Sequence, residues 1–218
     1  MEIKILRDVL ATNEAVAKEN ERLFGEKKVF VLNLMASPGA GKTSFILRTI
    51  EGLKDDFKMA VVEGDIASKV DAERVREQGV PAVQINTGGA CHLDANMIKN
   101  SLALLDLDEI DFLIIENVGN LVCPAEFNLG ETLRAMILSI PEGDDKPLKY
   151  PLMFTESHVL IVNKMDLLDW TDFDLERFKG VVGRLNSKMK VFELSCKSGE
   201  GVEDWIDWLK TRLISFRT

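Results

Sequence analysis

The chain has 218 residues, of which 46% are hydrophobic, and this is enough for one domain of ordinary size with a substantial core. Its formal net charge is −9, so it offers no basic field that would attract nucleic acid or an anionic membrane surface, and we expect neither as a partner. Strand-sized apolar runs and the lack of a signal-peptide pattern favour a soluble, cytoplasmic protein.

The first predicted element is a helix. Apolar side chains recur at helical spacing among many charged ones, at Ile3, Leu6, Leu10, Val16 and Leu23. Gly25 is the predicted end of this helix. We therefore predict an N-terminal helix over residues 1–25 that packs on a domain spanning residues 26–218.

Strand-like and helical runs alternate in the rest of the chain. The predicted strands cover residues 29–35, 58–63, 82–86, 112–116, 159–163 and 191–194. One predicted helix begins at Lys42, and the others cover residues 70–78, 94–105, 130–140, 175–187 and 202–215. Residues 141–151 are predicted to be an exposed loop. This alternation is typical of an α/β fold with a doubly wound, mainly parallel sheet and helices on both faces.

A predicted phosphate-binding loop joins the first strand to the helix at Lys42. Residues 36–43 read Ala-Ser-Pro-Gly-Ala-Gly-Lys-Thr, and the glycines permit backbone N–H groups to converge on a phosphate. Lys42 would reach the terminal phosphates, and the Thr43 hydroxyl would coordinate Mg²⁺. Ala36 stands where the usual pattern has glycine, and it would strain the turn only if a positive φ were needed there. The predicted nucleotide-binding residues of this loop are Gly39, Ala40, Gly41, Lys42, Thr43 and Ser44.

Two later loops predict guanine as the base. Asn163-Lys164-Met165-Asp166 follows a buried strand at the carboxyl end, where ligands bind in open α/β sheets. The Asp166 carboxylate can accept two N–H bonds from guanine, which adenine cannot offer. Asn163 would tie this loop to the phosphate loop, and the Lys164 stem would cover the base. Ser195-Cys196-Lys197, after the next strand, would present backbone N–H groups to the guanine O6.

Acidic loops close the strands at 58–63 and 112–116. Asp65 and Glu116 would lie beside Mg²⁺ and orient the attacking water, with Lys42 as the third catalytic group, and Gly119 would offer its N–H to a γ-phosphate. Each acidic pair taken alone is equally well explained as a helix N-cap or a solvated turn. The sequence places no arginine finger in cis, so we expect slow intrinsic hydrolysis.

Soft ligands also lie next to these loops. Three cysteines do not make a disulfide framework, and Cys91, His92 and Cys123 are suited to Zn²⁺ or Ni²⁺. The three residues fall one ligand short of a closed tetrahedral site, which a dimer or water would complete. Burial as a small core residue explains a free cysteine equally well, and Cys196 is interpreted as structural.

Together these segments resemble the HypB family, the nickel-inserting GTPases of [NiFe]-hydrogenase maturation. The resemblance rests on the phosphate loop, Glu63-Gly64-Asp65, residues 88–93, residues 116–124 and Asn163-Lys164-Met165-Asp166, and it runs from about Val29 to the C-terminus. It implies a P-loop GTPase of the signal-recognition and MinD-like class that binds GTP/GDP and Mg²⁺. It also implies a homodimer when GTP is bound, and a Ni²⁺ or Zn²⁺ site at Cys91, His92 and Cys123. The implied partners are a HypA-type nickel/zinc protein and the precursor of the hydrogenase large subunit.

Two departures and two alternatives remain. Ala36 replaces the first loop glycine, and the residues before Gly25 include no Cys or His that would make an N-terminal nickel motif. A urease-type nickel GTPase shares the phosphate loop but typically has Cys-Pro-His, where this chain has Cys123-Pro124-Ala125. The other alternative is a metabolic P-loop ATPase or kinase with buried cysteines and no transition metal.

Overall fold

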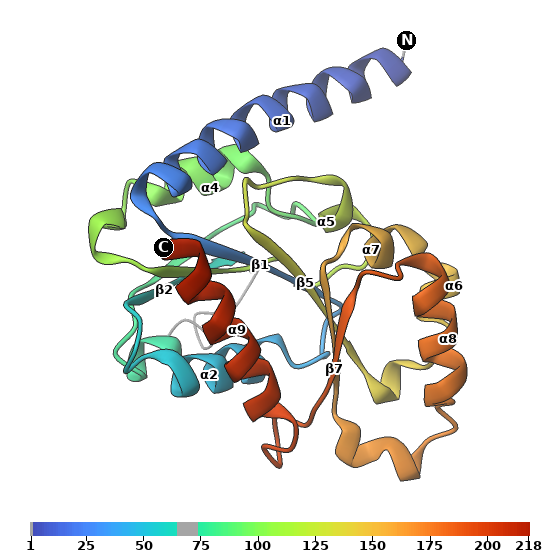
Figure 1. The fold of residues 1–218 in the computed structure, drawn as a ribbon. Helices are drawn as coiled ribbons and strands as arrows, with labels where there is room; N and C mark the ends of the chain where they lie inside the picture. Colours follow the sequence, from blue (N-terminus) through green and yellow to red (C-terminus); the bar gives the residue numbers. More distant parts are fainter. Residues whose placement is uncertain (1, 65–73) are drawn as a thin grey trace.

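The computed structural model describes residues 2–64 and 74–218, with side chains from Val9 onward. Its centre is one parallel sheet with the strand order β3-β2-β4-β1-β5-β6-β7, with helices on both faces (Figure 1). The strands are β1 Phe30–Ala36, β2 Met59–Gly64, β3 Ala82–Ile85, β4 Phe112–Glu116, β5 Leu133–Ser139, β6 Val159–Asn163 and β7 Lys190–Glu193. The predicted doubly wound parallel sheet is confirmed.

Helices and short 3₁₀ turns connect these strands. The α-helices are α1 Glu2–Lys27, α2 Lys42–Leu53, α4 Ala95–Leu102, α5 Cys123–Glu126, α6 Lys146–Lys149, α7 Pro151–Glu156, α8 Leu175–Leu185 and α9 Val202–Arg217. The 3₁₀ turns are η1 Leu107–Glu109, η2 Ile140–Glu142 and η3 Met165–Trp170.

The strand β1 is buried along its whole length because helices cover both faces of the sheet. Side chains alternate between the two faces of a strand. Leu32 and Leu34 therefore lie in one core with α2 and α9, where Trp205 of α9 is fully buried. Val31 and Met35 point to the other face, where α1 and α4 cover one half of the sheet and α7 and α8 cover the other.

The strand β5 corrects one prediction. The sequence analysis assigned residues 130–140 to a helix, and the segment does contain Leu, Ala, Met and Arg, which have high helix propensity. In the structure, β5 lies between β1 and β6, and Leu133 and Ala135 pair with residues of β1 and β6. Burial on both faces removes the alternation that marks an exposed strand, so the local sequence is ambiguous and tertiary pairing decides it.

Two element boundaries also differ from the prediction. The helix α1 continues through Gly25 to Lys27, and the chain turns at Lys28, whose φ is 54°. Residues 141–151 are not one exposed loop, because they contain the end of η2, all of α6 and the start of α7. Glu142 even turns inward and accepts a hydrogen bond from Ser37 of the phosphate loop. The domain boundary between residues 25 and 26 stays a prediction.

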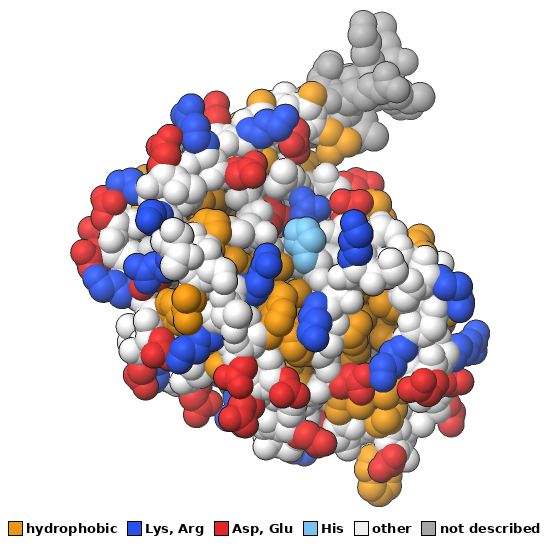
Figure 2. All heavy atoms as spheres, viewed as in Figure 1, with side chains coloured by type: hydrophobic (Ala, Val, Ile, Leu, Met, Phe, Trp, Pro, Cys, Tyr) orange, Lys and Arg blue, Asp and Glu red, His pale blue; other side chains and the backbone are white. Residues whose placement is uncertain are grey.

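Charges of both signs are interspersed on the face shown in Figure 2, around patches of hydrophobic side chains. On this face the charged side chains do not form one block of a single sign. In the described part of the chain, no helix combines the length and the apolar character needed to cross a membrane.

Candidate nucleotide and metal site

The phosphate loop has the backbone that its glycines predict. Gly39 and Gly41 have φ values of 78° and 103°, and Gly41 is the residue that precedes α2. The loop forms part of a cavity of about 420 Å³ at the carboxyl ends of β1 and β4. The predicted site residues that line this cavity are Gly39, Gly41, Lys42, Thr43, Ser44, Glu116 and Gly119.

Ala36 fits its position without backbone strain. Among the described residues other than glycine, only Lys28 and Lys164 have a positive φ. Ala36 is the last residue of β1, is fully buried and pairs with Ile137 of β5. The position therefore requires a small side chain and not a glycine conformation, and the doubt that the sequence raised about Ala36 does not apply.

The loop after β6 is tied to the phosphate loop by two side chains. The buried Asn163 donates from Nδ2 to the carbonyl oxygen of Ala40 at 2.9 Å, and Lys164 donates from Nζ to that of Gly39 at 2.8 Å. Asn163 Oδ1 also accepts from the backbone N–H groups of Lys164 at 2.8 Å and Cys196 at 3.2 Å. Asn163 thus joins three loops; the tie to the phosphate loop was predicted from the sequence, and the bond to the loop after β7 was not.

Asp166 and the loop after β7 lie on the same side of the phosphate loop as Asn163. Asp166 Oδ1 accepts a hydrogen bond from Ser195 Oγ at 2.6 Å, so the two predicted base-reading loops are in direct contact. The backbone N–H groups of Ser195 and Cys196 donate to Glu200 O and Asn163 Oδ1. Lys197 is exposed beside them.

Two buried carboxylates lie at the carboxyl ends of β2 and β4. Glu63 and Glu116 are paired in the sheet register, and both side chains are buried. Of the two, Glu116 lines the phosphate cavity together with Lys42 and Thr43. The predicted catalytic and Mg²⁺-binding residue Asp65 lies outside the described residues.

Arg74 is a residue of this cavity that the sequence analysis missed. It lines the cavity together with Lys42, Thr43 and Gly119. The sequence offers no motif that marks it, because it lies within a helical run of charged residues that reads as a solvated face. Its place beside the phosphate loop follows from the fold alone.

Gly119 brings the loop after β4 against the phosphate loop. A Cβ atom at Gly119 would lie 3.1 Å from Pro38 Cγ and 3.3 Å from Lys42 Nζ. A larger residue would therefore push against both the loop and its lysine. The backbone at Gly119 therefore lies directly against the phosphate loop and lines the phosphate cavity.

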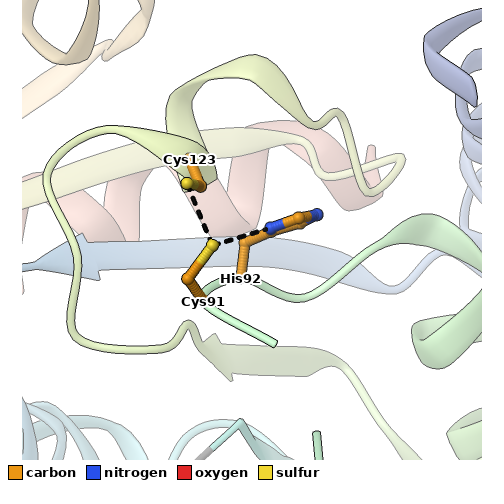
Figure 3. A group of neighbouring side chains, drawn as sticks. All are labelled: Cys91, His92 and Cys123. Atoms are coloured by element: carbon orange, nitrogen blue, oxygen red, sulfur yellow. Dashed lines mark hydrogen bonds between the residues drawn. The ribbon is translucent and has the colours of Figure 1, made fainter. Parts of the chain in front are cut away.

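Cys91, His92 and Cys123 form one cluster (Figure 3). Cys91 Sγ lies 3.0 Å from Cys123 Sγ and 3.6 Å from His92 Nδ1, and the three ligand atoms all lie within 4.8 Å of one another. The His92 ring stacks on Phe127, with centroids 3.8 Å apart. This contact fixes the plane of the imidazole, so the ring presents Nδ1 to the thiols.

The protonation states of the cluster make metal binding depend on pH. Burial lowers the pKa of His92, against the opposing charges of Asp94 and Glu126, so the ring is neutral and can act as a ligand. The hydrogen bond between the two thiols, with burial, raises the pKa of the Cys123 thiol. Cys123 therefore holds its proton until a metal ion displaces it.

The distance between the two thiols is shorter than tetrahedral coordination of one ion would allow. With metal–sulfur bonds of about 2.3 Å and tetrahedral angles, two thiolate sulfurs lie about 3.8 Å apart. The thiols of Cys91 and Cys123 are 3.0 Å apart, so the two sulfur atoms must move apart before both can bind one tetrahedral ion. Cys196 does not belong to the cluster, and burial raises the pKa of its thiol to about 11. It is a buried core residue, as the sequence analysis interpreted it.

Comparison with known proteins identifies the family. A family model for the CobW/HypB/UreG nucleotide-binding domain matches residues 30–193. The hydrogenase maturation factor HypB of Azotobacter vinelandii is 50% identical over 208 residues, which are 95% of this chain and 69% of that protein. This chain belongs to the HypB family. HypB of Escherichia coli K12 is 46% identical, over 97% of this chain and 72% of its own length.

Solved HypB structures have the same fold. HypB from Helicobacter pylori, in a complex with nickel, matches with a TM-score of 0.88 and 42% identity over 94% of this chain and 96% of that one. HypB from Archaeoglobus fulgidus matches with a TM-score of 0.88 and 40% identity over 93% and 99%. FlhF, in a complex with GMPPNP and Mg²⁺, matches at 19% identity with a TM-score of 0.53 and shares the fold only. Membership in the HypB family confirms the resemblance. It excludes the alternative that this chain belongs to a family of metabolic P-loop ATPases or kinases.

Proposed function

We propose that this protein is a GTP-hydrolysing metallochaperone that binds Ni²⁺ or Zn²⁺ and couples its nucleotide state to nickel insertion into [NiFe]-hydrogenase. The observation that carries this proposal is that one short segment serves both sites. Glu116 and Gly119 line the phosphate cavity, and Cys123, four residues further on, belongs to the thiol–imidazole cluster. The nickel complex of the H. pylori relative supports nickel as the ion.

On the nucleotide side, Lys42 binds the terminal phosphates and Asp166 accepts the guanine N–H groups. Thr43 and Asp65 would hold Mg²⁺, which neutralises charge on the phosphates, and the buried carboxylate of Glu116 at the same end of the cavity fits a cationic neighbour. Glu116 also orients the attacking water. Because the Ser195 and Cys196 amides are engaged within the protein, we assign the Lys197 amide to the guanine O6.

On the metal side, Cys91, His92 and Cys123 bind the ion. We propose that GTP draws two protomers together and changes the spacing of these ligands, and that slow hydrolysis then releases the metal. Such linkage is reciprocal, so bound metal must change nucleotide affinity by the same factor. A HypA-type nickel/zinc protein would supply the ion, and the precursor of the hydrogenase large subunit would receive it.

Metal titration of three proteins tests the metal site. We expect the unmodified protein and Cys196→Ala to bind Ni²⁺ or Zn²⁺ with the same affinity. Cys91→Ala should lose at least about tenfold in affinity, because even the loss of a residue that only hydrogen-bonds to a metal ligand costs that much. The Cys196→Ala variant is the matched control because it removes a thiol outside the cluster. Unchanged binding in Cys91→Ala would leave the cysteines as buried residues without a metal role.

Nucleotide competition tests the guanine assignment. The Asp166→Asn variant should lose affinity for GDP and gain affinity for xanthosine diphosphate, because an amide can donate to the oxygen that xanthine has in place of the guanine amino group. Equal competition by ATP and GTP in the unmodified protein would contradict the proposed base specificity.

A further inference from the structure

Asn120 is in contact with the phosphate loop and with both metal-binding loops. Its backbone N–H donates to the carbonyl oxygen of Ala36 at 2.8 Å, where β1 enters the phosphate loop. Its side chain donates from Nδ2 to the carbonyl oxygen of Cys91 at 3.3 Å and accepts at Oδ1 from the Val122 N–H at 2.8 Å. One residue therefore touches the loop that carries each thiol and the loop that would hold the nucleotide.

The bond to Val122 sets the position of Cys123. It closes a tight turn in which the Asn120 side chain accepts from the N–H two residues later, and this turn leads directly into α5, which begins at Cys123. A shift of Asn120 therefore moves the start of α5. Gly119, the residue before it, lies against Pro38 and the amine of Lys42, so a change around that amine reaches Asn120 through a single peptide unit.

Asn117 provides a contrasting, fixed attachment. It is fully buried, its Oδ1 accepts from the Leu93 N–H at 3.0 Å, and its Nδ2 donates to Asn33 Oδ1 at 3.2 Å. Asn33 in turn donates to Glu131 at 3.1 Å, so this attachment extends across the sheet. The loop that carries Cys91 and His92 is thus held rigidly at Leu93 and more loosely at Cys91, where the partly buried Asn120 holds it.

We propose that Asn120 is the positioning residue that sets the separation of Cys91 from Cys123 according to what occupies the phosphate cavity. This inference rests on the proposed function, because it names the contact through which nucleotide and metal are coupled. The Cys91 loop would turn about its fixed end at Leu93 while Asn120 moves with Gly119. The thiols, 3.0 Å apart in this structure, would then reach the wider spacing that a tetrahedral ion needs.

The test measures metal affinity with GDP and with a non-hydrolysable GTP analogue, in the unmodified protein and in Asn120→Ala. We expect the two affinities of the unmodified protein to differ by about fivefold or more, which is the usual range for coupled sites. In Asn120→Ala the ratio should fall to within about twofold of unity, because the side-chain bonds from residue 120 to the Cys91 carbonyl and from the Val122 N–H are then lost. Thiolate-to-nickel absorption should respond to the analogue in the unmodified protein only.

Asn186→Ala is the matched control. Asn186 also closes a turn, accepting from the Lys188 N–H at 3.2 Å, and it also donates to carbonyl oxygens of another segment, those of Phe154 at 3.1 Å and Ser157 at 2.9 Å. It is partly buried like Asn120 but lies at the end of α8. This variant should lose a similar set of bonds and keep the unmodified affinity ratio.

A second variant, together with the ratio of the two metal affinities, distinguishes a failure of the proposed function from a failure of the role of Asn120. Asn120→Asp keeps the acceptor for the Val122 N–H but removes the donor to Cys91, so it should keep the fold and lose most of the ratio, even if Asn120→Ala does not fold. A ratio of unity in the unmodified protein would contradict the proposed function. A clear ratio that persists in Asn120→Ala or Asn120→Asp would overturn the role of Asn120 and leave the proposed function standing.

Discussion

Gly41→Ala is a substitution whose effect the structure defines closely. The φ of Gly41 is 103°, and an L-residue held there costs about 1–3 kcal/mol of backbone strain. The added Cβ would also lie 2.4 Å from Asn163 Nδ2, which is closer than real Cβ atoms approach. The amide must therefore move away and give up its 2.9 Å bond to the Ala40 carbonyl. A buried carbonyl left without its partner costs about 1–3 kcal/mol more.

Gly39→Ala is the natural comparison because it isolates the backbone strain. Gly39 also has a positive φ, 78°, but its added Cβ would meet nothing within 4 Å. Both variants should weaken GDP binding through strain in the loop. Gly41→Ala should weaken it further by about tenfold to a hundredfold, because only that variant displaces Asn163 and each tenfold change corresponds to about 1.4 kcal/mol.

The assay is a fluorescent GDP titration of both variants and the unmodified protein, with urea denaturation of each to confirm that the fold is intact. If Gly41→Ala and Gly39→Ala bound GDP equally well, the contact between Asn163 and the phosphate loop would not contribute to nucleotide affinity, and our account of how the loops are joined would be wrong.

Three further outcomes are expected. Metal affinity should keep rising from pH 7 to pH 8, because the raised pKa of the Cys123 thiol means that the ion must displace its proton over this range. The rise should be up to about tenfold for this one proton, since the lowered pKa of His92 leaves the imidazole already neutral. A metal affinity that does not change over this range would contradict these protonation states. Arg74→Ala should slow phosphate release from GTP while GDP affinity stays within a few-fold, because Arg74 lines the phosphate cavity outside the loops that hold the base, and unchanged turnover would remove Arg74 from the site. Trp205→Ala should lower the free energy of unfolding by about 3–5 kcal/mol in urea, since Trp205 is fully buried and donates to Thr49 Oγ1, and a loss below about 1 kcal/mol would show that this core collapses around the missing ring.

The sequence predicted the parts of the site that depend on short-range chemistry. The glycines of the phosphate loop and the tie from Asn163 to that loop follow from residue type and from position at the carboxyl ends of strands. These residues have specific conformational or ligand requirements that few other residues satisfy. For that reason their arrangement can be read before any long-range contact is known. The residues alone left Cys91, His92 and Cys123 open between a metal site and buried side chains, and the family resemblance implied the cluster that the structure has.

The parts that the sequence did not predict depend on contacts between distant segments. The helix-forming composition of β5 is overridden by pairing with two neighbouring strands, and the position of Arg74 depends on how the chain returns to the phosphate cavity. The role we infer for Asn120 likewise rests on bonds to residues on two different loops. Asparagine is common in turns because its side chain can hydrogen-bond to the nearby backbone, so the sequence alone did not mark Asn120 as a functional residue.

The central place of β1 has a consequence for how the protein folds. Phe30 pairs with Phe112 of β4, and Leu32 pairs with Leu133 of β5, so both neighbours of β1 come from far along the chain. Contacts between such distant segments form slowly because long loops must close first. The phosphate loop leaves the end of β1, so it gains its native surroundings only after segments more than a third of the chain away have arrived. We therefore expect the ability to capture GDP to appear late in refolding, after most of the helical signal has returned.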